Sequence, residues 1–369
     1  MSRNALARCR PFAASAAAAR RSPTPLLAAL LAGLLAFCPS PSHAADLLSP
    51  AKLAPRALVV ITHDPGATDA FRPHLEKVRP MVNRAITSLT HKPTVPEAWR
   101  SLISTQDVVG IKVFSTPGPN SGTRPAVVAA VVEGLLATGL PPKRIIVWDR
   151  QLTDLRLAGY SALAERYDIH LAGSAQAGWD PNTFYHPDTP ILGNLVWGDL
   201  EFGKKGDGVG RKSFVSKLLT RQITKIINIT PLLNHNLAGV SGHLFSLATG
   251  SVDNLIRFDS SPQSLATAIP EIYTLPALGD RVVLNITDAL ICQYEGGERG
   301  LLHYSTMLNQ LRFSRDPVAL DVLSLQELDR QRQAAHAPAV KPNLQLYSNA
   351  ALLPLGVDDL KRIQVDPLP

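Results

Sequence analysis

Polar side chains that could do chemistry sit in or just after apolar, strand-like segments of this 369-residue chain. Lys112 lies inside the apolar run 108–114, and Asp149 and Arg150 follow the run 144–148. A lysine inside such a run needs a carboxylate or a bound anion, because an unpaired buried charge is costly. The alternative is a lysine at a sheet edge whose amino group reaches water.

Two later segments, 226–233 and 283–290, resemble each other, since both are apolar and contain Asn-Ile-Thr. They place Asn228 and Asn285 at matching points, and Asp288 follows the second tripeptide. Open parallel sheets bind ligands at the carboxyl ends of their strands. We therefore expect these polar residues to meet at one edge of a sheet.

His235 and His243 belong to a glycine-rich stretch, 234–250. They are eight residues apart, so they do not share the face of one helical turn. A loop between them would bring both onto one divalent metal ion. Local capping or hydrogen bonding of each imidazole is the alternative.

Asp316 and Pro317 open a predicted helix as N-cap and first helical residue. Asp321, one turn later among apolar residues, needs a partner if it is buried. The full prediction is one strand-end site with three classes of residue. They are the catalytic residues Lys112, His235 and Asp288, the ligand-binding residues Asp149, Arg150, Asn228, Asn285 and Asp321, and the metal ligands His235 and His243.

Strand-like and helix-like segments alternate along the chain, which predicts an α/β fold. Continuous rather than alternating apolar strands indicate a mostly parallel sheet with helices on both faces. The expected strands are 57–62, 108–114, 144–148, 225–229 and 281–286, and the expected helices are 69–89, 95–103, 124–138 and 316–331.

We expect a single α/β domain over 45–333. Within it, 173–210 is rich in Gly, Pro, Asp and Asn and predicts a long irregular insertion, with a hairpin around 191–197. Insertions of this length are often functional lids or binding loops. The Pro-rich tail, 334–369, is expected to wrap the surface.

The N-terminus is typical of a cleavable export signal over 1–44. Five arginines precede the apolar run 26–37, and Ser42-His43-Ala44 matches a signal-peptidase site. We expect a periplasmic or secreted protein exported by the general secretory route, although Arg20-Arg21 leaves the twin-arginine route open. Membrane contact is expected only through this segment before its cleavage.

Loss of the leader changes the charge balance from +7 to 32 basic against 30 acidic residues. That balance gives no electrostatic footprint for nucleic acid, so no nucleic-acid partner is expected. It also leaves Cys292 as the single cysteine. One cysteine cannot ligate an iron–sulfur cluster unaided, so no such cluster is expected, whereas a divalent metal remains a candidate cofactor.

Five segments in order resemble the domain of unknown function 362 family over about 108–325. They are Val109-Gly110-Ile111-Lys112-Val113, residues 145–150, residues 235–250, Asp288-Ala289-Leu290, and Ser314-Arg315-Asp316-Pro317-Val318-Ala319-Leu320-Asp321. The resemblance implies an α/β domain, frequent export and, in some members, ferredoxin-type clusters, but no established reaction. The chain departs from the family pattern at Phe114, where asparagine is usual, and at 233–234 and 245–246, where lysines are usual.

Two functions follow from these observations. The first is an exported enzyme that acts on a small anionic substrate at the strand-end site, with Lys112 holding the anion and His235 as acid, base or metal ligand. The alternative is a periplasmic protein that binds a small ligand, or serves as a cofactor accessory, without catalysis.

Overall fold

The structure of the protein, a computed structural model, describes residues 56–187, 193–259 and 261–369. These residues belong to one compact unit, Leu53–Pro369. The predicted signal segment, 1–44, lies outside the described residues.

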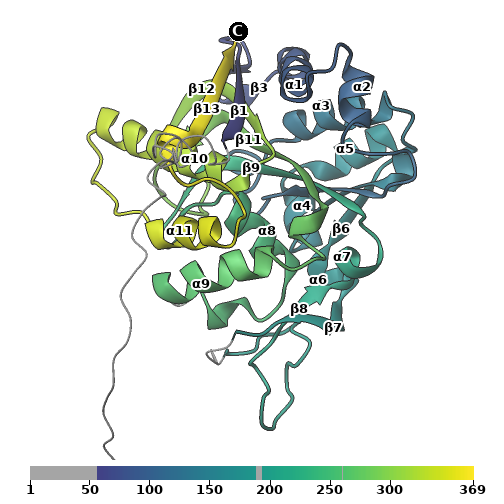
Figure 1. The fold of residues 1–369 in the computed structure, drawn as a ribbon, viewed down its shortest axis with the longest axis vertical. Helices are drawn as coiled ribbons and strands as arrows, with labels where there is room; N and C mark the ends of the chain where they lie inside the picture. Colours follow the sequence, from purple (N-terminus) through teal and green to yellow (C-terminus); the bar gives the residue numbers. More distant parts are fainter. Residues whose placement is uncertain (1–55, 188–192, 260) are drawn as a thin grey trace, which may run out of the picture. The chain divides into compact units, whose positions relative to one another are not determined.

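A central sheet organises this unit (Figure 1). All its long strands run parallel except β12, which is antiparallel to both of its neighbours, β1 and β11. In spatial order the strands are β13 (Ile363–Leu368), β1 (Ala57–His63), β12 (Ser305–Ser314), β11 (Val282–Gln293), β9 (Lys225–His235), β4 (Val109–Val113), β5 (Ile145–Asp149) and β6 (His170–Gly173), with the short β10 (Gly239–Val240) paired to β9.

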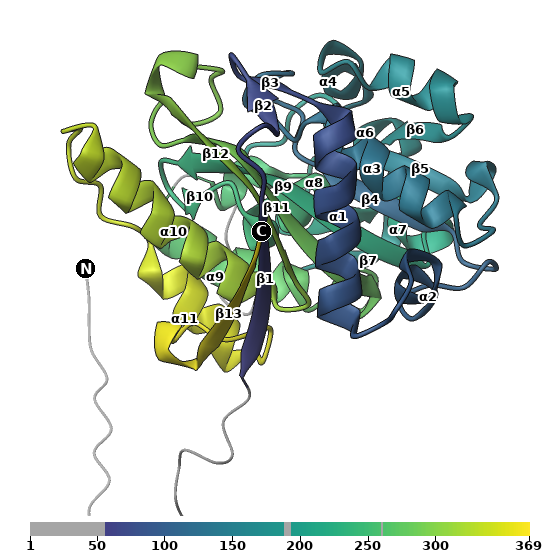
Figure 2. The same cartoon turned by 90° about the horizontal axis from the view of Figure 1, so that it is seen from above.

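Helices cover both faces of the sheet, as Figure 2 shows for α1 and α10 on opposite sides of β1. One face carries α1 (Leu75–Thr90), α2 (Val95–Arg100), α3 (Pro125–Leu136), α4 (Leu152–Leu157) and α5 (Tyr160–Tyr167). The other face carries α7 (Lys217–Arg221), α8 (His243–Ser251), α9 (Pro262–Tyr273), α10 (Pro317–Ala334) and α11 (Leu344–Leu352). The predicted fold class, α/β with a mostly parallel sheet, is confirmed.

The two faces of the sheet differ in polarity. On β9, Ile227 and Ile229 join the core under α1 and α3, so the alternating residue Asn228 points to the α8 side. Asn228 is in register with Lys112 on β4 and with Asn285 on β11, and Asn285 is in turn in register with Ser314 on β12. All four of these polar residues have no solvent exposure. The α8 face of the sheet is thus buried but polar, and its hydrogen bonds must come from the protein.

The predicted helix 69–89 begins later than expected. α1 starts at Leu75, after a small hairpin of β2 (Thr68–Asp69) and β3 (Arg72–Pro73). Ala70 and Phe71 form its turn with φ of 44° and 64°, left-handed values that end any helix there.

The insertion 173–210 contains more regular structure than predicted. After α6 (Ser174–Ala177), strand β7 (Trp179–Tyr185) pairs antiparallel with β8 (Ser213–Ser216). The expected hairpin around 191–197 is therefore wrong for its described part, since 193–197 form no strand. The pairing strands lie farther out, and the described residues between them, 186–187 and 193–212, form no helix or strand.

The tail is part of the fold rather than a surface wrap. α11 packs against α9 and α10, and β13 pairs in parallel with β1 at the edge of the sheet. Its proline content predicted a tail that wraps the surface, but Pro367 sits on an edge strand, where a missing N–H is tolerated. Within the described ranges, no helix combines the length and apolar character needed to cross a membrane.

We predict that deleting residues 363–369 lowers the free energy of unfolding by on the order of 3 kcal/mol, because the backbone hydrogen bonds between β1 and β13 are lost. Urea unfolding of the truncated and full chains measures this change. Deleting Pro369 alone is the control and should have little effect. Equal stability of the two truncations would mean that β13 does not pair in solution.

Candidate functional site

The Lys112 ammonium group donates all of its hydrogen bonds within the protein. Its Nζ donates to Asp149 Oδ1 at 2.8 Å, to Ser246 Oγ at 3.0 Å and to the Val113 carbonyl at 2.6 Å. Burial lowers the pKa of Lys112, and the charge of Asp149 opposes that shift. Of the two predicted partners, the structure therefore shows the carboxylate, and no N–H of the ammonium is left for an anion.

Both carboxylate oxygens of Asp149 also accept hydrogen bonds within the protein. Its Oδ2 accepts hydrogen bonds from the backbone N–H and the hydroxyl of Ser115, both at 2.7 Å. Its Oδ1 also accepts from the Arg150 backbone N–H at 2.8 Å. The Arg150 guanidinium turns away, to the carbonyl of Val252 at 2.8 Å. The pair Lys112–Asp149 thus joins β4, β5 and, through Ser246, α8.

Asn228 and Asn285 continue this polar layer as direct neighbours on β9 and β11. Asn228 Nδ2 donates to the His243 carbonyl at 3.0 Å, and Asn285 Nδ2 donates to the Arg315 carbonyl at 3.3 Å. Both Oδ1 atoms are buried without a protein donor among the described residues. The two amides hold α8 and the β12–α10 turn against the sheet.

Asp321 lies at the N-terminus of α8, although it belongs to α10. Its two oxygens accept from the backbone N–H groups of His243 at 2.7 Å and Leu244 at 3.0 Å. Burial raises the pKa of Asp321 to about 7, and these two donors oppose the shift. The partner that the sequence required for Asp321 is the end of a helix, which carries a partial positive charge.

The two histidines face different surroundings. His243 Nε2 lies 3.0 Å from Thr287 Oγ1 and 3.3 Å from Thr230 Oγ1, and burial lowers its pKa to about 3. His235 Nδ1 accepts from the backbone N–H groups of Leu237 and Ala238, and burial lowers its pKa to about 4.

Burial thus favours the neutral form of both imidazoles. The hydrogen bonds of His235 are local, which is the alternative that the sequence left open. His243 instead contacts threonines of β9 and β11, and its Nδ1 is buried without a protein partner among the described residues. His235 also stacks on Phe245, with 4.1 Å between the ring centroids. No group of three His, Cys, Asp or Glu side chains arranged to hold a metal occurs within the described ranges. The predicted metal ligation gains no support from these contacts.

Asp288 lies apart from the other predicted catalytic residues. It follows Thr287, which faces α8, so the alternation of the strand turns Asp288 toward α3. Its Oδ2 accepts from the Arg124 backbone N–H at 2.9 Å and lies 3.1 Å from the guanidinium Nη1 of Arg124. Lys112 and Asp288 therefore lie on opposite faces of the sheet, and the expected grouping of Lys112, His235 and Asp288 around one substrate does not form.

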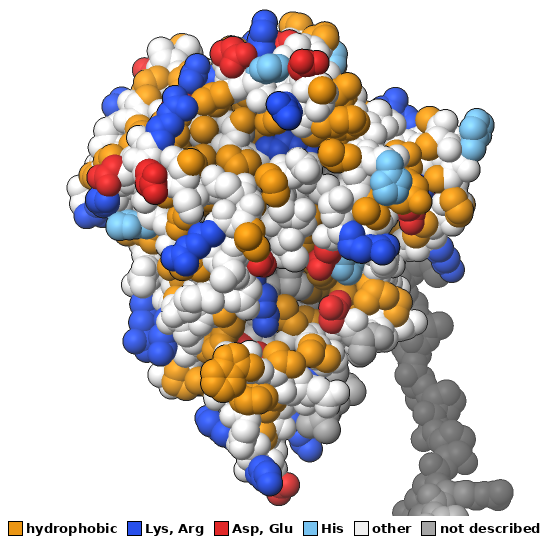
Figure 3. Space-filling view, turned by 180° about the vertical axis from the view of Figure 1, so that it is seen from behind, with side chains coloured by type: hydrophobic (Ala, Val, Ile, Leu, Met, Phe, Trp, Pro, Cys, Tyr) orange, Lys and Arg blue, Asp and Glu red, His pale blue; other side chains and the backbone are white. Residues whose placement is uncertain are grey.

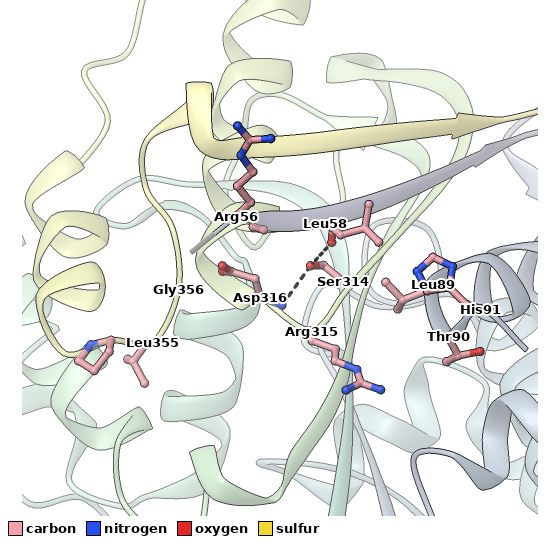
Figure 4. A pocket seen from close by; sticks show the side chains of 12 residues that line it. Arg56, Leu58, Leu89, Thr90, His91, Ser314, Arg315, Asp316, Leu355 and Gly356 are labelled. Carbon is pink, nitrogen blue, oxygen red and sulfur yellow. Dashed lines mark hydrogen bonds between the residues drawn. The ribbon is translucent and has the colours of Figure 1, made fainter. Parts of the chain in front are cut away.

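An open cavity lies at the other end of the strands, away from the carboxyl ends of the parallel strands, where β1 begins and β12 ends (Figure 4). Its volume is about 590 Å³. It is lined by Arg56, which precedes β1, His91, which follows α1, and Arg315, which follows β12. The side chains of these three residues make no hydrogen bond or ion pair with the described residues. Sequence reasoning missed these three because it searched only the carboxyl ends of the parallel strands.

One carboxylate lines the same cavity, and it is already bonded. Asp316 Oδ1 accepts from the Ala319 backbone N–H at 2.9 Å, which confirms the predicted N-cap, and Oδ2 accepts from Val357 N–H at 2.9 Å. Ser314 Oγ donates to the Leu58 carbonyl, drawn as a dashed line in Figure 4. Among the side chains that line the cavity, those of Arg56, His91 and Arg315 therefore remain available to a ligand.

Comparisons with known proteins give little further information. No family model and no curated protein matches the chain. A protein from Thermotoga maritima with a crystal structure resembles it with a TM-score of 0.40 and 11% identity, over 73% of this chain and 61% of that one. This chain thus spans about three-fifths of that protein's length, and a likeness this distant carries no argument about function.

We predict that Gly250→Ala lowers the free energy of unfolding by about 2 kcal/mol through overpacking. A Cβ at this position would lie 2.2 Å from Lys112 Cε. Helix propensity alone would favour alanine by about 1 kcal/mol. The sign of the change in the free energy of unfolding therefore distinguishes overpacking from propensity. Gly66→Ala is the control, since its nearest atom is 3.4 Å away. Chemical unfolding that shows stabilisation by Gly250→Ala would contradict the seating of α8 on Lys112.

A second prediction concerns acid stability. His243 binds a proton near pH 6.5 in the unfolded chain but only near pH 3 in the folded protein, so its contribution is full above pH 6.5 and is lost as the pH falls toward 3. Between pH 7 and pH 5 this loss is about 2 kcal/mol.

The variant His243→Gln should therefore lose about 2 kcal/mol less than the parent protein over the same pH interval, whatever its stability at pH 7. Urea unfolding at both pH values measures the difference. Identical pH dependence of His243→Gln and the parent would show that the buried imidazole takes up a proton in the folded state.

Proposed function

We propose that this protein binds a small anionic molecule in the cavity of Figure 4, as a ligand-binding or cofactor-accessory protein without catalysis. The observation that supports this is the charge of the cavity. Arg56, His91 and Arg315 have no side-chain partner among the described residues, whereas Asp316, the carboxylate among the lining residues, is already held by two backbone N–H groups.

The chemistry of these side chains favours a carboxylate or phosphate group. The planar guanidinium of arginine donates two parallel hydrogen bonds to such groups, and a charged acceptor strengthens each of them. A cavity of about 590 Å³ is within the range that small-molecule sites occupy. With the predicted export signal, this binding would take place in the periplasm or outside the cell.

An enzyme at the strand ends is the second candidate. The observation in its favour is that burial raises the pKa of three carboxyl groups, those of Glu298, Asp154 and Asp259. The negative charges of Asp259, Asp149 and Asp154 raise the pKa of Glu298 further. Carboxyl groups with raised pKa values can serve as general acids. We place it second because Lys112, the residue meant to hold the anionic substrate, has no N–H left to donate.

We predict that inorganic phosphate or succinate binds to the full chain and that Arg315→Gln weakens binding about tenfold, by the loss of one charge-assisted hydrogen bond. Titration calorimetry measures the dissociation constants. Arg156→Gln removes another exposed arginine, on α4, which does not line the cavity, and should leave the dissociation constants unchanged. Equal binding by Arg315→Gln and the parent, or none by the parent at millimolar anion, would reject the proposal.

A further inference from the structure

Residues 193–212, which precede β8 and are called the β7–β8 loop below, expose two large aromatic side chains. Trp197 is 86% exposed and Phe202 is 46% exposed. Their rings meet edge to face, with centroids 5.8 Å apart. Figure 3 shows hydrophobic side chains gathered on the projecting lobe that this loop forms in Figure 1. Exposed apolar groups of this size usually mark an interaction surface.

The exposure of this aromatic pair is built into the fold. Asp199 lies between the two aromatic residues in sequence, and its carboxylate accepts from Val196 N–H at 2.8 Å and Asn254 N–H at 3.0 Å. Trp179 Nε1 donates to the Gly198 carbonyl at 2.6 Å. The backbone on both sides of Trp197 is thus tied to the body of the protein. A pre-organised loop loses less conformational entropy when it binds.

Residues 193–212 carry four basic and three acidic side chains, a small excess of positive charge. Lys204, Lys205 and Arg211 are exposed in the same loop. Of its carboxylates, Asp199 is buried in the hydrogen bonds above and Glu201 accepts from Gly210 N–H at 2.9 Å. Asp207 is the exposed carboxylate of residues 193–212. The exposed charges of this segment are therefore three cationic side chains and one carboxylate, Asp207.

We propose that this loop docks the protein on a membrane surface that contains anionic lipids. Trp197 and Phe202 would enter the interfacial region, where tryptophan is favoured, and the flanking lysines would remain at the level of the headgroups. Each lysine near an anionic surface adds to the affinity. The charge complementarity and the convex, projecting shape of the lobe favour a lipid surface over a protein partner.

Tryptophan fluorescence of the full chain tests this contact. The other three tryptophans, Trp99, Trp148 and Trp179, are at most 4% exposed, and residues 1–55 contain none. Emission that responds to solvent therefore reports Trp197, even if the N-terminal segment also binds lipid. With vesicles of phosphatidylcholine and phosphatidylglycerol we expect emission to move to shorter wavelength and brominated acyl chains to quench it.

Two variants separate the aromatic and the charged contributions. Trp197→Ser should abolish the emission shift and lower vesicle partitioning about tenfold, through loss of one buried tryptophan side chain. The double variant Lys204→Gln, Lys205→Gln should lower partitioning about twentyfold on anionic vesicles and little on pure phosphatidylcholine. Leu157→Ser is the control, because Leu157 is 77% exposed on α4.

Three results would overturn the proposal. The first is an unchanged emission spectrum with anionic vesicles while circular dichroism shows a folded protein. The second is quenching that survives in Trp197→Ser. The third is a shift that grows with protein concentration without lipid, which would assign the loop to contact with a second copy of the chain.

Discussion

A lysine ammonium group shut away from water must find its solvation inside the protein, and in this molecule that requirement organises the centre of the sheet. Lys112 is flanked by strands and covered by α8, and an unpaired charge there would cost several kcal/mol. Asp149 supplies the opposite charge, Ser246 supplies a hydroxyl, and Gly250 leaves room for the side chain. The position of α8 is therefore tied to the neutralisation of one charge.

Two other buried carboxylates also hold helices in place through their charge. Asp321 bonds the first N–H groups of α8, and Asp288 bonds the start of α3 from the opposite face of the sheet. Both act on helix ends that belong to distant parts of the sequence. Polar residues at strand ends can thus resemble a catalytic cluster while they serve to attach helices. The pKa shifts of Asp321 and His243 have the same origin, since both groups are closed off from water.

Groups that remain available to other molecules lie at the periphery. The cavity at the start of β1 keeps two arginines and a histidine without protein partners among the described residues, and the β7–β8 loop keeps Trp197 in solvent. The buried layer under α8 still supports the cavity, since Ser314 of that layer lines it and Asn285 bonds the Arg315 carbonyl. Binding at an edge cavity and attachment through a projecting loop are compatible, because the two proposals use different residues and different elements.

The sequence by itself determined the α/β class, because continuous apolar strands alternating with helical segments can be buried only between two layers of helices. It also identified Asp316 as a helix cap, since that bond is local. Local patterns could not reveal that Asp321 would meet α8 or that Asp288 would face away from Lys112, because those contacts join residues 77 and 164 positions from their partners. Strand register and helix packing decided them, and the same long-range packing brought Arg56, His91 and Arg315 together around one cavity.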